Sequence, residues 1–262
     1  MSDRKLMLAD CSLVEVEEQL ARSPKVLVPV GATEQHGSHA PFGTDFILST
    51  EVSRRVARRI DALVAPPLAY GVSGDHGGYA GVPYLSPATM TALVQDVVTS
   101  LAEGGFREIV LVNGHYTNFI VLSAAIMEIG DRLPAGTIAF PFNYWDALPA
   151  DQLAAYLGPE VGLHANIGET SAVMAVDPSL VDLSRAEAEY PEFPLTPTPA
   201  MVSAYFFSAR GSLPRASRSG VWGDPTGSTA EQGEVYLSQI ETAATQFVHD
   251  VEAIFGAFPE RA

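Results

Sequence analysis

Short apolar runs alternate along the chain with longer stretches in which apolar residues recur every three or four positions. The short runs are typical of buried strands, and they lie at residues 26–30, 63–65, 108–112 and 137–140. The longer stretches predict helices at 13–22, 48–60, 87–101, 118–129, 170–176 and 230–255, and a short helix within 151–163. Ser86 and Pro87 support one of these helices, as its cap and its first residue.

The alternation of strands with helices predicts an α/β fold with a mainly parallel sheet. Ligands in such folds gather at the carboxyl ends of the strands. Residues 185–228 break the pattern, because they are rich in Pro, Ser and Gly and show little periodicity. Aromatic residues are interspersed there, so we expect irregular structure that covers the domain and not a linker.

The first apolar run is followed at once by potential metal ligands. Residues 26–45 read VLVPVGATEQHGSHAPFGTD and contain Glu34, His36, His39 and Asp45. If the chain stays extended after the strand, Glu34 and His36 point to the same side. Carboxylates and imidazoles suit a divalent ion such as zinc, manganese or iron. A polar surface loop would contain the same residue types, but the position at a strand end favours a metal site.

Further polar and aromatic candidates follow other elements. His115 comes directly after the strand 108–112, in an Asn-Gly-His turn. Glu169 begins an apolar helix, where a carboxylate could equally serve only the helix dipole. His76 lies in a Gly-rich loop and would either line a substrate pocket or be exposed. Tyr116 and Trp145 could wall a pocket or simply pack in the core.

Composition limits the classes of partner. The chain has 262 residues, of which 47% are hydrophobic, so it can bury a large core. Its net charge of -16 argues against nucleic acid or an anionic membrane as the main partner. The single cysteine excludes an internal disulfide and makes a cytoplasmic location the default. We expect neither a signal peptide nor a membrane span, because no sufficiently long apolar run occurs.

Motifs for other chemistries are absent from the sequence. There is no Gly-x-Ser-x-Gly, no dinucleotide-binding glycine pattern and no P-loop. Cys11 has no histidine near it in the sequence. Hydrolysis by metal-activated water is therefore the favoured hypothesis.

Several of these segments together resemble the creatininase family of metal-dependent amidohydrolases. The matching motifs are Thr33-Glu34-Gln35-His36-Gly37, Asp45, Asn113-Gly114-His115, His164 through Glu169-Thr170-Ser171, and Gly220-Val221-Trp222-Gly223-Asp224-Pro225. The similarity extends over roughly residues 12–250. It implies one domain over residues 1–262, an α/β three-layer sandwich, a site for two divalent metal ions and a homo-oligomer, often a hexamer.

The resemblance also implies roles for individual residues. The metal ligands would be Glu34, His36, Asp45, His115 and Glu169, with Asp45 bridging the two ions. His164 and Glu169 would be catalytic, and His164 would act as the acid/base or carbonyl-polarising residue. Members of the family open cyclic amides, remove formyl groups from pyrimidine precursors or cleave a modified peptide.

The chain departs from creatininase itself at two positions. Thr117 stands where creatininase has a metal-binding Glu, and Glu160 stands where it has a flap Trp. Tyr116 and Tyr144-Trp145-Asp146 resemble creatininase more than the deformylase branch. We therefore expect a hydrolase of a small amide, cyclic amide or formamide, with His76, Tyr116 and Trp145 contacting the substrate. The alternatives are a non-catalytic metal- or ligand-binding protein of the same fold and a peptidase of a modified peptide.

Overall fold

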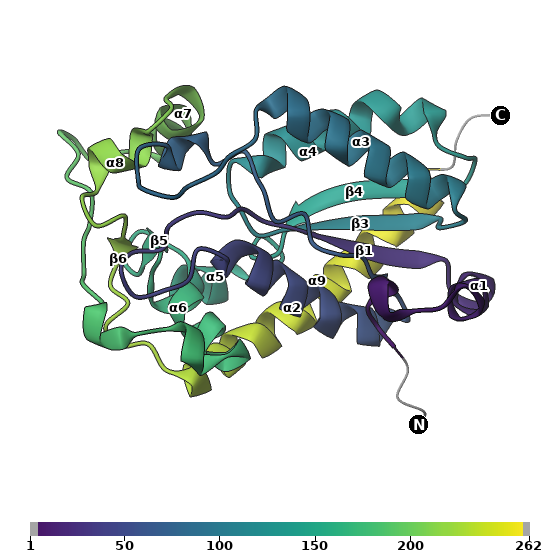
Figure 1. Ribbon diagram of the computed structural model, residues 1–262, viewed down its shortest axis with the longest axis horizontal. Helices are drawn as coiled ribbons and strands as arrows, with labels where there is room; N and C mark the ends of the chain where they lie inside the picture. Colours follow the sequence, from purple (N-terminus) through teal and green to yellow (C-terminus); the bar gives the residue numbers. More distant parts are fainter. Residues whose placement is uncertain (1–4, 259–262) are drawn as a thin grey trace.

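A four-stranded parallel sheet forms the middle of the molecule in the computed structural model, which describes residues 5–258 (Figure 1). Its strands are β1 (Lys25–Val30), β2 (Leu63–Val64), β3 (Glu108–Asn113) and β4 (Ile138–Asn143), in the order β2-β1-β3-β4. β1 and β3 pair along their whole length, from Lys25 opposite Glu108 to Val30 opposite Asn113. Their carboxyl ends consequently lie side by side.

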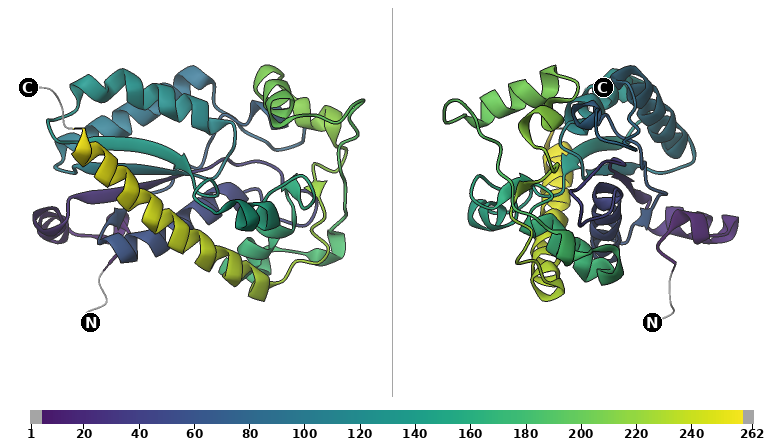
Figure 2. Two further views of the ribbon diagram at one scale, coloured as in Figure 1. Left: turned by 180° about the vertical axis from the view of Figure 1, so that it is seen from behind. Right: turned by 60° about the vertical axis from the view of Figure 1, so that its left-hand side comes forward.

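Helices cover both faces of this sheet (Figures 1 and 2). On one face, Ile109 and Leu111 of β3 pack with α3 (Pro87–Glu103) and α4 (Asn118–Ile129). On the other face, Val110 and Val112 pack with α2 (Thr44–Ile60) and α9 (Ala230–Ala257). Alternate residues of one strand thus belong to two separate hydrophobic cores, one on each face of the sheet. The predicted α/β three-layer sandwich with a mainly parallel sheet is confirmed.

Local capping signals explain where several helices begin. α1 (Leu13–Arg22) starts after Ser12, which forms a capping box with Glu15. α3 starts after Ser86, whose side chain accepts a hydrogen bond from the backbone N–H of Thr89. Both helices, and α4, begin at the residues expected from the sequence. No helix within residues 5–258 is long and apolar enough to cross a membrane.

Pro29 lies inside β1, although proline has no N–H to donate to a neighbouring strand. The backbone groups of Leu27, Pro29 and Gly31 face the β2 side, where Pro29 O accepts from Leu68 N at 2.9 Å. β2 ends at Val64 and pairs with β1 only at Val26 and Leu27, so no residue of β2 lies opposite Pro29 to accept the N–H that proline lacks. The proline is therefore tolerated in an inner strand.

The carboxyl end of the sheet is covered by the later part of the chain (Figure 1). This part contains α5 (Ala150–Tyr156), β5 (Gly162–His164), α6 (Ile167–Val176), α7 (Pro199–Ser208), α8 (Ser212–Ala216) and β6 (Trp222–Gly223). β5 and β6 form an antiparallel pair that the sequence did not predict. The prediction that residues 185–228 are irregular was wrong for α7 and α8. α7 is capped by Thr198 and has apolar residues on several sides, which hides the helical period.

Two helices begin earlier than their apolar pattern predicts. α2 begins at Thr44 and not at residue 48, and α6 begins at Ile167 and not at residue 170. Asn166 caps α6 by accepting a hydrogen bond from the backbone N–H of Glu169 at 3.0 Å. Both first turns mix polar and apolar residues, so the apolar period alone places these helix starts too late. As a result, Asp45 and Glu169 belong to first helical turns.

Candidate metal centre and cavity

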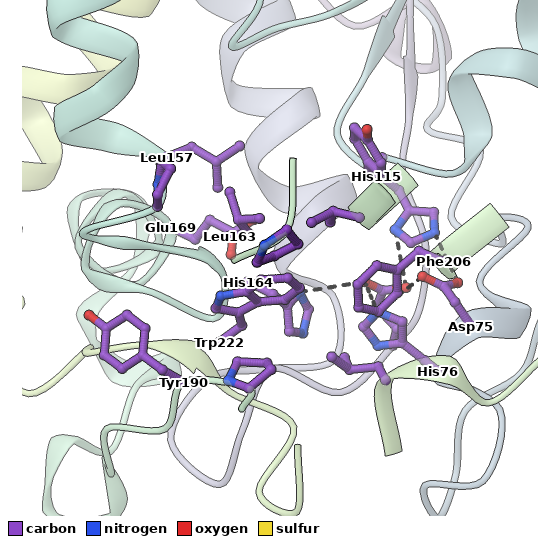
Figure 3. Close-up of a pocket in the computed structure, with 18 of the residues that line it drawn as sticks. Asp75, His76, His115, Leu157, Leu163, His164, Glu169, Tyr190, Phe206 and Trp222 are labelled. Atoms are coloured by element: carbon purple, nitrogen blue, oxygen red, sulfur yellow. Dashed lines mark ion pairs between the residues drawn. The ribbon is translucent and has the colours of Figure 1, made fainter. Parts of the chain in front are cut away.

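A cavity of about 530 Å³ opens at the carboxyl ends of β1 and β3 (Figure 3). Most of the candidate residues named from the sequence line it: Glu34, Asp45, His76, His115, Tyr116, Trp145, His164 and Glu169. His36 is completely buried, with Nε2 3.2 Å from Oδ1 of Asp45. The fold thus brings together side chains that are up to 135 positions apart, from Glu34 to Glu169.

Two groups of potential metal ligands share Asp45. The first consists of Glu34, Asp45 and His115, and the second of His36, Asp45 and Glu169. In each group the ligand atoms lie within 4.8 Å of one another. A third group, Glu34, His36 and His164, overlaps both.

The separations within the first group fit a metal ion. Nδ1 of His115 lies 3.2 Å from Oε2 of Glu34 and 3.3 Å from Oδ2 of Asp45. Tetrahedral ligands about 2.05 Å from a zinc ion would be roughly 3.3 Å apart. Among the described residues, Oε2 of Glu34, Nε2 of His36 and Oδ2 of Asp45 are buried without a hydrogen bond. Nitrogen and carboxylate oxygen donors with this spacing suit zinc or manganese.

Gly114 allows His115 to reach this centre. A Cβ at Gly114 would collide with the backbone carbonyl oxygen of Asp45, so only glycine lets the turn after β3 approach α2 this closely. The side chain of Asn113 holds the turn. Its Nδ2 donates to the backbone carbonyl of His115 at 2.6 Å and to the side-chain oxygen Oδ1 of Asn143 at 2.7 Å.

Thr117 fixes which nitrogen of His115 faces the centre. Its Oγ1 donates to the carbonyl of Val72 at 2.9 Å and lies 2.6 Å from Nε2 of His115. The carbonyl can only accept, so the single hydroxyl proton is used there and Oγ1 accepts from Nε2–H. Nδ1 of His115 is then left to face Glu34 and Asp45, as a metal ligand requires.

His164 is held in one tautomer in a similar way. Its Nε2 lies 2.9 Å from the backbone carbonyl of Gln35 and must donate to it. Nδ1, 4.0 Å from Oε1 of Glu34, therefore carries the lone pair. Burial lowers the pKa of His164 well below its usual range, so the ring is neutral. A neutral ring with its free nitrogen towards the centre can accept a proton.

His76 contacts Glu34 as well as the cavity. Its Nδ1 lies 3.3 Å from Nε2 of Gln35, an amide nitrogen that can only donate, so Nε2 of the neutral ring carries the proton. That nitrogen lies 3.3 Å from Oε1 of Glu34. Burial lowers the pKa of His76 well below its usual range, in keeping with the neutral form. His76 can therefore orient the Glu34 carboxylate.

The carboxylates of the centre are buried, so their negative charges need nearby positive charges or protons. Burial raises the pKa of Glu34 to about 8 and also raises that of Glu169. Burial alone would lower the pKa of His36, but the carboxylate of Asp45 raises it to about 9. The imidazoles of His115 and His36 outweigh burial at Asp45 and lower its pKa. Divalent cations would supply the compensating charge that protons otherwise provide.

One acidic residue at the centre was missed from the sequence, and one candidate lies outside it. Asp75 is buried, lines the cavity and has its Oδ1 3.9 Å from Nε2 of His115, without a hydrogen bond among the described residues. The available signal was a carboxylate beside His76 in a Gly-rich loop.

His39 is in none of the three ligand groups of the described chain, and its Nε2 lies 2.9 Å from Oγ1 of Thr170. It supports α6 instead.

The α/β sandwich thus holds a buried group of carboxylates and histidines, able to bind divalent metal ions, at its strand ends. The family model for creatininase, described as creatinine amidohydrolase, matches residues 9–248. The chain belongs to the creatininase family.

Individual relatives differ in their described activities. A creatinine amidohydrolase of Pseudomonas putida is 36% identical over 213 residues, covering 74% of this chain and 82% of that protein. A mycofactocin precursor peptide peptidase of Mycolicibacterium smegmatis is 32% identical over 226 residues, covering 83% of this chain and 81% of that protein. A solved manganese form of creatininase has a TM-score of 0.77 and 30% identity, covering 98% of this chain and 100% of that one. Another creatininase structure, with a TM-score of 0.78, is described as a Zn-Zn type.

Proposed function

We propose that this protein hydrolyses the C–N bond of a non-peptide amide, cyclic amide or formamide, using two divalent metal ions that share Asp45. The observation that carries the proposal is the membership of Asp45 in both ligand groups, with Oδ1 near His36 and Oδ2 near His115. A carboxylate that uses one oxygen towards each group is suited to bridge two ions.

Each residue of the centre has a role in this proposal. Glu34, Asp45 and His115 would hold one ion, and His36, Asp45 and Glu169 the other. When bound, the ions would polarise the substrate carbonyl and lower the pKa of a coordinated water. His164 would accept a proton at Nδ1 and pass it to the leaving nitrogen. The neutral state and fixed tautomer of His164 support this role.

The surrounding residues would position the substrate. Trp145 is almost completely buried and stacks edge-on against Tyr144, with ring centroids 4.9 Å apart, so its face of the cavity is rigid. Tyr116 is 45% exposed, and its hydroxyl lies 2.7 Å from Oγ of Ser203 in α7. We propose that both contact the substrate, together with His76. We further propose a cytoplasmic homohexamer, in line with the resemblance described above.

Metal content in matched variants tests the shared ligand. Protein purified without chelators should contain about two ions per chain, Glu169→Gln and His115→Ala about one, and Asp45→Asn close to none. His249→Ala is the control for histidine removal, because His249 is exposed on α9 and outside the ligand groups of the described chain. Unchanged metal content in Asp45→Asn would refute the bridging role.

Turnover is tested on the same preparations. The panel contains creatinine, a cyclic imide, a formamide and a short peptide, the last because a peptidase is among the relatives. Hydrolysis of a non-peptide amide that is lost in Asp45→Asn and His164→Ala would support the proposal. Full metal content without turnover on any substrate would favour the non-catalytic binding protein instead.

A further inference from the structure

The cavity consists of two regions of opposite character. Its acidic and histidine residues all belong to the metal centre or adjoin it: Glu34, Asp45, Asp75, His76, His115, His164 and Glu169. The outer wall is formed mainly by apolar and aromatic side chains, among them Leu157, Tyr190, Phe193, Phe206, Leu213 and Trp222. In Figure 3, Leu157 and Tyr190 lie on the opposite side of His164 from Asp75 and His76. Phe206 is drawn beside Asp75 and His76, so the apolar side chains begin next to the charged residues and continue to the far side of His164.

The aromatic side chains of the outer wall pack against one another. The ring of Trp222 lies between those of Phe193 and Phe206, with centroid distances of 5.5 Å to each. Trp222 belongs to β6 and pairs with His164 of β5 in the antiparallel register. Backbone hydrogen bonding thus joins the aromatic wall to the strand that carries the proposed acid/base.

The wall offers no charged partner to a substrate. Among the described residues that line the cavity, no lysine or arginine is present, and every carboxylate lies at the centre. A carboxylate or phosphate carried by the far end of a substrate would lose its hydration without gaining an ion pair. The cavity volume of about 530 Å³ also exceeds what a single small ring fills. A small substrate would leave the apolar side chains of the wall in contact with water, so the complex would lack the free energy that burying them provides.

From the two regions we infer that the substrate amide carries a bulky uncharged apolar group, either aromatic or branched aliphatic. This group packs against Phe193, Phe206 and Trp222 while the amide carbonyl reaches the metal centre. The inference rests on the proposed amide hydrolysis, and it adds the chemical class of the substituent.

Hydroxamates of different side chains test the inference without requiring turnover. Acetohydroxamate, phenylacetohydroxamate and the monohydroxamate of succinate would be titrated into metal-loaded protein by calorimetry. The phenyl compound should bind at least about tenfold more tightly than the acetyl compound. The succinate compound should bind no more tightly than the acetyl compound, because no cation meets its carboxylate.

Variants of α7 locate the effect. Phe206→Ala should reduce the preference for phenyl over acetyl at least about threefold, because the phenyl group loses a ring against which it packs. Met201→Ala is the matched control, since Met201 is 51% exposed on the same helix and does not line the cavity. Phe206→Leu, which retains most of the volume, gives an intermediate preference and covers the case in which the alanine variant does not fold.

The outcomes separate this inference from the proposed function. Equal affinity for phenyl and acetyl compounds, or a preference for succinate, would overturn the inference even if amides are hydrolysed. Hydrolysis of acetamide and phenylacetamide is measured on the same protein. A retained phenyl preference with no hydrolysis of either amide would support the apolar site and count against the proposed reaction.

Discussion

The contact between α6 and α9 allows a quantitative prediction for Gly233→Ala. Gly233 is buried in the first turns of α9, where the helix crosses α6. A Cβ at this position would lie 2.9 Å from the backbone nitrogen of Ala172 and closer still to the carbonyl of Ser171. These are backbone atoms, so no side chain can turn away. The helices must part by roughly 1 Å or more to restore ordinary contacts.

The cost follows from two opposing effects. Overpacking of this kind costs up to about 3 kcal/mol, and rigid backbone on both sides places it at the upper end. Alanine in a helix gains about 1 kcal/mol over glycine. The free energy of unfolding should therefore fall by about 2 kcal/mol, which lowers Tm by about 4 °C in a chain of this size. Glu169 lies two residues before Ser171, so metal affinity should fall as well.

Thermal denaturation followed by circular dichroism measures this change. Gly256→Ala provides the same substitution near the other end of the same helix, where a Cβ would have no atom within 4 Å. That variant should be unchanged or stabilised by up to about 1 kcal/mol. A Tm of Gly233→Ala equal to that of the wild type would refute the reasoning about the crossing.

Three further predictions concern the metal centre and the sheet. Thr117→Val should weaken metal binding about 10–100-fold in a chelator competition while Thr117→Ser retains it, because only a hydroxyl can accept from Nε2–H of His115. Chelation should lower Tm, and manganese at about 100 times its Kd should restore about 2.7 kcal/mol per ion; an unchanged Tm would count against a bound metal. Burial raises the pKa of Glu108 from 4.5 to about 7, so the native state binds this proton more tightly than the unfolded state does. The contribution of Glu108 to the free energy of unfolding should therefore fall as the pH rises from 4.5 to about 7. Glu108→Gln should remove this component from urea unfolding measured at intervals between pH 4.5 and 8, and an identical pH profile would contradict it.

Burial explains which parts of the fold could be predicted from the sequence. β1, β3 and α4 each bury a continuous run or a regular stripe of apolar residues, and these patterns are visible without a structure. The two-residue strand β6 and the apolar helix α7 offer no such pattern, because their neighbours and not their own periodicity decide their structure. Cap residues such as Asn166 act through side-chain hydrogen bonds and extend helices beyond the apolar stripe.

The candidate site divides in the same way. Glu34, His36 and His115 could be proposed because they directly follow strands, and the parallel topology brings strand ends together. Asp75 was missed although His76 beside it was proposed, because a single carboxylate in a Gly-rich loop is a weak signal. The role of Thr117 was also hidden, because it depends on the carbonyl of Val72, which lies 45 positions earlier in the chain. The resemblance marked Thr117 as a departure, whereas its hydrogen bonds give it a part in orienting His115.

The order of residues along the chain separates the proposed metal ligands from the aromatic wall of the cavity. The ligand groups end at Glu169, while most of the aromatic wall lies within residues 190–222, in a segment between α6 and α9. Substitutions, insertions or whole-segment exchange in that part of the gene can therefore remodel the wall without altering a single ligand. The segment returns to the site through β6, where Trp222 pairs with His164 of β5.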